Sequence, residues 1–572
     1  MLFPSFFNAV APPYQIEQNL RFDGTADLVL TTPATTESIN AFTMSCWVKV
    51  LHGSDQTQFM GRKGAPNNVN NVWLTHNALG GQGIGSYMYT SSINGRGVLN
   101  TDAKYRDYSA WMHVHYSLDS SSGNNQKLYV NGVDVTANTD TISGVLTFDF
   151  SSTYPFQIGN ASSSKFYLAE YHFISGSRPD YTNFGEEDDN GVWRPIEYTG
   201  SYGNNGFYLK FDPSATNGVG HDHSGTGNHF TATGFTTSGT GTDVMSDTPT
   251  TNYMTFNPLD TSRDMSSSFY LNNGNLDLNV TNNSSYRNLS ATFWPEGLKG
   301  YFEVTVSTGT PNFHIGFTDF DRVLTKSDYT VSNVNYYISE AGTVKNGATN
   351  IHSGYLSSFS SGDTLGIAFD FTGGNRNVWF SKNGTFGSTS DGAGDPAEGT
   401  NPALTTTQLD VEQRFYFAIN TGSGLQTISL NTGQRDFENT PPTGFKTLNT
   451  KNLPAPTIKD GSDHFNTVTY TGTGASNSRT DVGFQPDFLW IKSRSNTHYH
   501  VLVDAVRNNG GSGSFLEVFS NDSASEQQYT GRVTSLDSTG FTVGTDSQAG
   551  VNTLNNTYVA WNWLDRDWET KT

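Results

Sequence analysis

Apolar and polar residues alternate along short segments over most of the chain. In the stretch "LGIAFDF" (Leu365–Phe371), every second residue is large and apolar, and the residues between are small or charged. This period of two is typical of β-strands with one buried face. Asn-Gly pairs at 131–132 and 383–384 favour the type I′ turns of β-hairpins. The pattern predicts an all-β chain of serial β-sandwich domains.

Two changes in composition divide the alternating segments into three blocks. The stretch 214–253 is rich in Gly, Thr and Ser, and 438–463 contains repeated prolines, so both are predicted to be linkers. We therefore expect an N-terminal arm at 1–20, β-sandwiches at 21–213 and 254–437, and a C-terminal β domain at 464–572.

The first residues, "MLFPSFFNAVAPPYQIEQN", are apolar, but no basic segment precedes them and Pro4, Pro12 and Pro13 interrupt them. They are too short to span a bilayer and lack the features of a signal peptide. We interpret them as an extended arm that becomes ordered against another chain. This predicts attachment to other proteins and no membrane insertion.

The charge of the chain limits its partners. There are 32 basic and 53 acidic residues, which gives a net charge of −21 spread along the sequence. A nucleic-acid partner is not expected, because binding to phosphates requires a basic surface that releases counterions.

Cys46 is the only cysteine, so no intrachain disulfide can form. It lies in "FTMSCWVKV", where Phe42, Met44, Cys46 and Val48 would share one strand face. This pattern predicts a buried, inert thiol and synthesis in a reducing cytoplasm.

Catalytic motifs are absent from the sequence. It contains no G-x-S-x-G nucleophile elbow, no P-loop and no H-E-x-x-H helix motif. No strand carries the alternating carboxylates that a retaining glycosidase would place about 5 Å apart. We therefore expect a non-enzymatic protein with no catalytic residues.

Two clusters of titratable residues are candidate metal sites. The run Glu186–Asp189 lies between glycines and is interpreted as a solvated acidic turn, with a calcium site as the alternative. In "GHDHSGTGNHF", His221, His223 and His229 surround Asp222, but the glycines favour a turn over a metal site. We predict no metal and no cofactor, and calcium stays open.

Tyrosines mark the longest irregular stretch of the second block, residues 321–350. Tyr329, Tyr336 and Tyr337 would offer rigid, amphipathic contact groups to a binding partner if they are exposed. Local packing beneath the loop is the alternative for all three.

Trp379 is the third kind of binding candidate. If Val378 and Phe380 point into the sandwich, Trp379 points away from it. We expect a neighbouring domain or subunit to cover it, and a contact surface for a partner is the alternative. Either way, Trp379→Ala would lower assembly or binding without unfolding the domain.

The C-terminal stretch "VGFQPDFLWIKSR" is bulky and apolar. Its large side chains suit a buried strand, so we predict that Phe484, Phe488, Trp490 and Ile491 belong to the core rather than to a ligand platform.

Longer motifs connect two blocks with known families. "KGYFEVTV", "HIGFTDF", "SSGDTLGIAFDF", "NVWFSKNG" and "ISLNTGQRDF" occur in an order and spacing that resemble a SPRY domain. "LRFDGTADLVL", "FTMSCWVKV", "QKLYVNGVDV" and "FYLAEYHFISG" make the first block similar to laminin-G-like, concanavalin-type jelly rolls. The resemblance implies a jelly roll followed by a SPRY-like sandwich and a C-terminal β domain.

Four further motifs follow one another along the chain: "FGEEDDNGVWRPIEYTGSYGNNGFYLKFD", "DHSGTGNHFTATGFTTSGTGTDVMSDTPTTNY", "TPPTGFKTLNT" and "VGFQPDFLWIKSRS". Through these motifs the whole chain resembles a group of structural proteins from tailed, mostly marine and cyanophage-like bacteriophages. Those proteins carry a similar Asp-x-Ser-Gly-x-Gly-Asn turn, matched here by residues 222–228, which favours a conformational role for Asp222.

This resemblance implies a virion protein, made in the host cytoplasm, that acts as a tail fibre or appendage in host-surface recognition. The implied partners are other virion proteins, through the N-terminal arm, and a host surface glycan or protein. Such appendages are closed homo-oligomers, and a trimer is the first expectation. A head fibre or capsid-decorating protein is the first alternative, and a polysaccharide depolymerase is the second.

Overall fold

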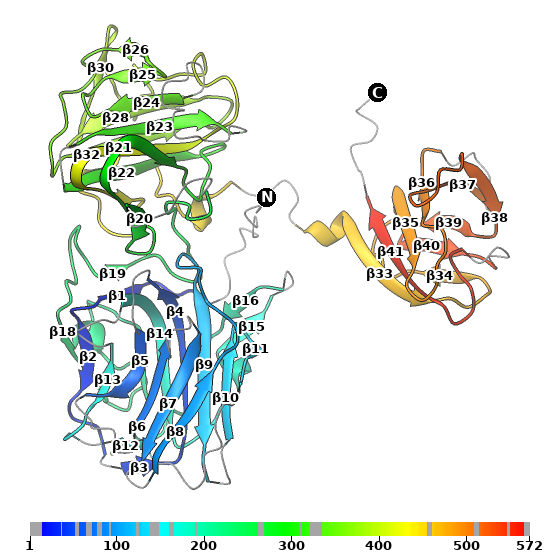
Figure 1. The fold of residues 1–572 in the computed structure, drawn as a ribbon, viewed down its shortest axis with the longest axis horizontal. Coiled ribbons are helices and arrows are strands. Elements are labelled where there is room, and N and C mark those ends of the chain that lie inside the picture. Colours follow the sequence, from blue (N-terminus) through cyan, green and yellow to red (C-terminus); the bar gives the residue numbers. More distant parts are fainter. Residues whose placement is uncertain are drawn as a thin grey trace. The chain divides into compact units, whose positions relative to one another are not determined.

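The structure is a computed structural model of the chain. It describes residues 14–35, 37–51, 57–63, 71–76, 83–90, 93–121, 125–137, 148–150, 152–159, 165–188, 191–260, 268–308, 311–320, 335–454, 460–507, 514–545 and 550–564. The described residues form strands, with no α-helix among them; the only helical turns there are short 3-10 turns, at Tyr181–Asn183, Gly218–Gly220, Thr450–Asn452 and Gly461–Asp463 (Figure 1). The described part has no helix with the length and hydropathy that crossing a bilayer requires. The all-β prediction is confirmed.

The first domain consists of two large sheets packed face to face (Figure 1). One sheet has the order β11 (Val133–Asp134), β10 (Asn125–Val130), β9 (Met112–Asp119), β4 (Ala41–Val50), β14 (Lys165–Ser175), β1 (Asn19–Asp23), β19 (Val244–Met245), and β17 (Phe207–Leu209) also pairs with β14. The other has the order β18 (Thr231–Thr233), β2 (Asp27–Leu30), β13 (Phe156–Ile158), β5 (Thr57–Arg62), β6 (Asn71–His76), β7 (Ile84–Thr90), β8 (Ile93–Asn100). Two short ribbons join β12 (Phe148–Phe150) to β3 (Glu37–Ile39) and β15 (Gly185–Glu187) to β16 (Trp193–Pro195).

Strand β4 shows how the sequence pattern becomes a core. Phe42, Met44, Cys46 and Val48 point between the two sheets and are almost completely buried. Burial in these apolar surroundings raises the pKa of the Cys46 thiol. The prediction that Cys46 is buried is confirmed.

The structure changes the picture of the N-terminal arm. Residues 1–13 lie outside the described residues, but the rest of the predicted arm belongs to the first domain. Ile16 and Leu20 are buried, and β1 pairs with both β14 and β19. Because β1 fills a place inside the sheet, an arm that includes residues 14–20 is not free to dock elsewhere.

The predicted linker at 214–253 is also part of the first domain. Its strands β18 and β19 pair with β2 and β1, and Val219, Phe230 and Met245 are buried. The hydrophobic pattern did not predict that this segment belongs to the domain. Its strands are only two or three residues long and are separated by polar turns, which is too short for a period of two to be recognised.

The second domain is a sandwich built mostly from one long, folded sheet (Figure 1). Its order is β26 (Thr349–His352), β25 (Val344–Asn346), β24 (Asn335–Ser339), β23 (Phe313–Asp319), β32 (Gln413–Asn431), β22 (Lys299–Thr308), β27 (Thr364–Asp370), β28 (Asn377–Lys382), β29 (Thr385–Phe386). Strand β21 (Asp277–Leu289) pairs with β32 and with β20 (Phe269–Asn272), and β30 (Ser388–Thr389) pairs with β31 (Gly392–Ala393).

This domain continues past the boundary predicted at residue 437. Leu448 is buried in its core and accepts a backbone hydrogen bond of 2.9 Å from Met254. The backbones of Lys446 and Tyr301 are also hydrogen-bonded, at 3.0 Å. Most of the proline-bearing segment is therefore structure rather than linker.

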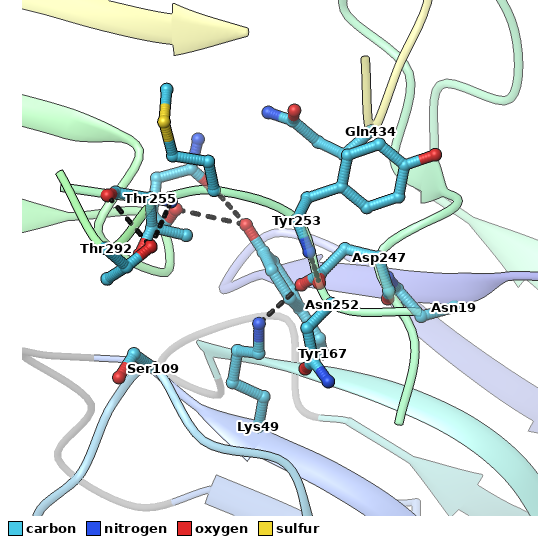
Figure 2. Close-up of polar contacts among 12 residues, drawn as sticks. Asn19, Lys49, Ser109, Tyr167, Asp247, Asn252, Tyr253, Thr255, Thr292 and Gln434 are labelled. Carbon is cyan, nitrogen blue, oxygen red and sulfur yellow. Dashed lines mark hydrogen bonds and ion pairs between the residues drawn. The ribbon is translucent and has the colours of Figure 1, made fainter. Parts of the chain in front are cut away.

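A buried ion pair lies where the chain passes from the first domain to the second (Figure 2). The Lys49 ammonium pairs with the carboxylate of Asp247, and the two side chains are 2% and 6% exposed. Asp247 also accepts a hydrogen bond of 3.1 Å from the Tyr253 backbone. Tyr167, from the first domain, donates a hydrogen bond of 3.1 Å to the Asn273 carbonyl of the second.

The chain divides into two compact units between Pro454 and Ala455, and the C-terminal domain belongs to the other unit. Its larger sheet has the order β33 (Phe465–Thr471), β41 (Thr557–Trp563), β35 (Phe488–Ser493), β36 (Val501–Asp504), β37 (Ser514–Phe519), β38 (Gln527–Thr530). Its smaller sheet has the order β34 (Asn477–Arg479), β40 (Gly540–Val543), β39 (Val533–Asp537). A core cluster that includes Leu489, Ile491, Phe541 and Tyr558 lies between them.

Candidate functional site

Trp379 lies on the face of β28 opposite Val378 and Phe380, as predicted, but it is only 1% exposed. Its indole Nε1 donates a hydrogen bond of 2.8 Å to the carbonyl of Thr400. The prediction that a neighbouring domain or subunit covers this ring is therefore wrong, and so is the alternative of a contact surface for a partner.

The cover comes from the same domain. Trp379 clusters with Tyr301 and Ala368, and with Phe437 and Phe445 of the following segment. The rings of Trp379 and Phe445 meet edge to face at 6.1 Å between centroids. The sequence analysis placed Phe445 in a linker, so it could not predict that this side chain covers Trp379.

The tyrosine candidates are not exposed either, as far as the structure describes them. Tyr336 is 5% exposed within the core cluster, and Tyr337 is 2% exposed. Tyr337 donates a hydrogen bond of 2.7 Å to the Gly347 carbonyl and stacks on His314. Tyr329 lies outside the described residues. For Tyr336 and Tyr337, local packing is the correct interpretation and a binding role is not.

The acidic turn is partly structural. Glu186 and Glu187 are exposed on β15, whereas Asp188 pairs with Arg194 and accepts a hydrogen bond of 2.9 Å from the Val192 backbone. Among the described residues, no group of three or more His, Cys, Asp or Glu side chains is arranged to hold a metal ion. Asp189 lies outside the described residues.

Asp222 organises the histidine-containing turn. Its carboxylate accepts hydrogen bonds from the backbones of Tyr208, Ser224 and Asn228, each at 2.9 Å, and from the Thr226 hydroxyl at 2.8 Å. A buried carboxylate with four donors holds a fixed loop conformation. This arrangement agrees with the conformational role that the sequence favoured.

Three histidines elsewhere are held neutral by burial. Burial lowers the pKa of His113 well below its usual value and lowers the pKa of His115 and His314 to about 3. His113 accepts a hydrogen bond of 3.0 Å from the Trp193 indole at Nδ1, and its Nε2 lies 2.7 Å from the Ser45 hydroxyl. Both ring nitrogens are therefore used by the neutral form.

This burial predicts how stability depends on pH. The unfolded histidines bind protons below about pH 6.5 and the folded ones do not, so the free energy of unfolding falls as pH drops from 6.5 towards 3. For His314, which stacks between Tyr286 and Tyr337 at 4.2 Å, the loss from pH 6.5 to 4.5 is about 2 kcal/mol. In urea unfolding, His314→Phe should keep the stacking and reduce this pH dependence of the second domain by that amount. Identical pH dependence in both proteins would contradict the assignment.

A group of partly exposed aromatic rings lies on the C-terminal domain. Successive residues of β35 and β41 alternate between the core and the other side of the larger sheet. Leu489 and Ile491 are buried, whereas their neighbours on the outer side remain partly exposed. We name the outer group the aromatic face; it consists of Phe465, Phe488, Trp490, Trp561 and Trp563.

Strand pairing sets the geometry of the aromatic face. Trp490 lies opposite Trp561, with 5.4 Å between ring centroids and 58° between ring planes. Trp563 contacts Phe488 at 5.1 Å and Phe465 at 5.0 Å, and Phe465 is 41% exposed. The rings lie on one side of three adjacent strands and form two contact groups, and within each group the ring planes are tilted rather than parallel.

Polar side chains border the aromatic face. Thr467 and Thr469 of β33 are both exposed. Thr467 pairs with Trp561 in the sheet, and Thr469 is the next residue of β33 on the same side. Lys492 of β35 and Asp504 of β36 occupy outer positions on the other side, where the half-buried Leu502 also pairs with Trp490. An apolar surface with hydroxyl groups and one charge of each sign around it has the composition of a binding surface.

The sequence prediction for this region was half right. Ile491 and Phe484 are buried in the core, but Phe488 and Trp490 are on the aromatic face. The alternation in "FLWIKS" contained the signal, because Phe488 and Trp490 share their face with Lys492, which is rarely buried. The prediction relied on the large size of the Phe488 and Trp490 side chains and not on the strand face that they share with Lys492.

Comparisons with known families match two parts of the chain. Residues 23–175 match the family model of the concanavalin A-like lectin/glucanases superfamily, in its laminin G form. Residues 460–570, which include the whole aromatic face, match a domain of unknown function, DUF7483. No curated protein matches the chain.

Several solved structures are similar to parts of the chain. A human SPRY domain is 15% identical over 29% of this chain and 95% of its own, with a TM-score of 0.21. The LG4-5 domains of mouse laminin alpha1 are 10% identical over 75% of this chain and 95% of theirs, with a TM-score of 0.24. A candidate carbohydrate binding protein from Bacteroides ovatus is 21% identical over 39% of this chain and 59% of its own, with a TM-score of 0.28. A laminin-G-like, concanavalin-like domain and SPRY-like neighbours, both expected from the sequence, are thus among the similarities found.

Proposed function

We propose that this chain is a non-enzymatic structural protein of a bacteriophage virion, a tail fibre or appendage that binds the host surface. The phage assignment and the virion location come from the sequence resemblance described above. Host surface glycan or protein is the external partner, and other virion proteins bind through the first thirteen residues. The assembled form is a homo-oligomer, with a trimer as the first expectation. The chain acts without a cofactor or bound metal.

The aromatic face is the observation that carries this proposal. Tryptophan and tyrosine side chains contribute much of the binding energy in many protein interfaces. Several partly exposed aromatic rings side by side, such as Trp490 and Trp561, therefore indicate a binding surface. The region that matches a lectin and glucanase superfamily supports a binding rather than a catalytic role, because the sequence carries no catalytic carboxylate pair.

A competition experiment tests this function. Host cells preincubated with the purified full-length chain should adsorb the phage more slowly, because the protein occupies the receptor. Heat-unfolded protein at the same concentration is the control. Unchanged adsorption at saturating protein would contradict a role in host recognition, and release of soluble oligosaccharides from the cells would contradict the non-enzymatic assignment.

A further inference from the structure

We propose that the aromatic face binds a neutral glycan, whose pyranose rings lie against Trp490, Trp561 and Trp563. This inference rests on the proposed function, since it names the class of ligand that the binding surface takes. The argument uses the size of the face, its chemistry and its charge.

The size of the face favours a small or narrow ligand. A fully accessible aromatic side chain offers about 150–250 Å², and the five rings are mostly covered by their neighbours. Together they expose on the order of 400 Å² at most. A stable protein interface buries about 800 Å² on each partner, so this face is too small to hold a protein or a second copy of the chain alone.

The chemistry of the face fits a sugar ring. The C–H groups on one side of a pyranose are weakly positive and pack on the negative face of an aromatic ring. The 58° tilt between Trp490 and Trp561 presents ring surface in two directions, towards neighbouring sugar units. The exposed hydroxyls of Thr467 and Thr469 lie where the hydroxyl groups of a stacked sugar need partners.

Charge selects among glycans. Lys492 and Asp504, one of each sign, are the charged side chains at the described outer strand positions of this sheet, and Asp504 is paired with Arg507. Residues 460–572, the domain that carries the face, have 13 acidic and 7 basic residues, which gives a net charge of −6. A polyanionic polysaccharide would be repelled by that field and would find no basic cluster to hold it. A neutral glycan meets neither obstacle.

The test uses the full-length chain in native gels that contain dextran, mannan, galactan or laminarin, with alginate and hyaluronan as acidic polysaccharides. The wild-type protein should be retarded by at least one neutral polysaccharide. The Trp490→Ala/Trp561→Ala variant should bind at least tenfold more weakly. Thr467→Ala/Thr469→Ala changes only exposed side chains and should bind several-fold more weakly, so the test holds even if the tryptophan variant is unstable. Leu554→Ala, at a 62% exposed side chain of the same domain, is the matched control and should bind normally.

The outcomes separate this inference from the proposed function. Retardation by acidic polysaccharides only, or by none of the six, overturns the neutral-glycan assignment. If the variants still lose adsorption to host cells in that case, and protease treatment of the cells also abolishes it, the face binds a protein and the proposed function stands. If the wild-type chain does not adsorb to host cells at all, the proposed function fails independently of the gels.

Discussion

Lys49→Met is expected to lower the free energy of unfolding of the first domain by about 3–5 kcal/mol. The ammonium and the Asp247 carboxylate are both almost completely buried, so removing one partner leaves the other charged and unpaired in a dry environment. The cost arises mainly from the desolvated Asp247, since Met can still pack against the nearby rings of Trp111 and Tyr167.

A double variant distinguishes this explanation from a simple packing defect. Lys49→Met/Asp247→Asn removes both charges and keeps an acceptor for the Tyr253 backbone, so it should recover most of the lost stability. Lys127→Met is the matched control, because the ion pair of Lys127 with Asp134 is about 40% exposed and should contribute less than about 1 kcal/mol. Urea unfolding followed by fluorescence provides the measurement. Equal losses for the Lys49 and Lys127 variants would contradict the buried ion pair.

Trp379→Ala is expected to destabilise the second domain by about 3–5 kcal/mol. The side chain is 1% exposed, so its removal leaves a cavity beneath Phe445 and breaks the indole hydrogen bond to the Thr400 carbonyl, which keeps a backbone hydrogen bond of 3.1 Å from Asp395. Trp379→Phe keeps much of the ring and should cost about 1–2 kcal/mol, from the lost indole hydrogen bond and the smaller packed volume. Thermal unfolding of the two variants and the wild type is the measurement.

This outcome replaces the expectation drawn from the sequence alone, which was loss of binding with normal stability. A Trp379→Ala protein that unfolds at the wild-type temperature would show that the ring is not part of the core. Both outcomes are visible without any knowledge of the ligand.

Strand alternation was sufficient to predict the interior of each sandwich. "LGIAFDF" and "FTMSCWVKV" place their apolar residues in the core as expected. Alternate residues of a strand share one face, so burying that face determines which side chains enter the core. The all-β class and the buried Cys46 follow from the same pattern.

Local pattern failed where burial depends on segments distant in sequence. Residues 231–233 pair with β2 although they are exposed and polar, and Phe445 covers Trp379 from 66 positions further along the chain. No periodicity within either segment encodes those contacts. The aromatic face was missed for a different reason, since the register of Phe488, Trp490 and Lys492 was in the sequence but the size of the side chains suggested a core.

The most direct test of the account is the adsorption of fluorescently labelled full-length protein to host cells. We predict saturable binding by the wild-type chain, at least tenfold weaker binding by the Trp490→Ala/Trp561→Ala variant and wild-type binding by Leu554→Ala. Equal adsorption of the wild-type protein and a folded double variant would contradict the claim that this chain recognises its host through the aromatic face.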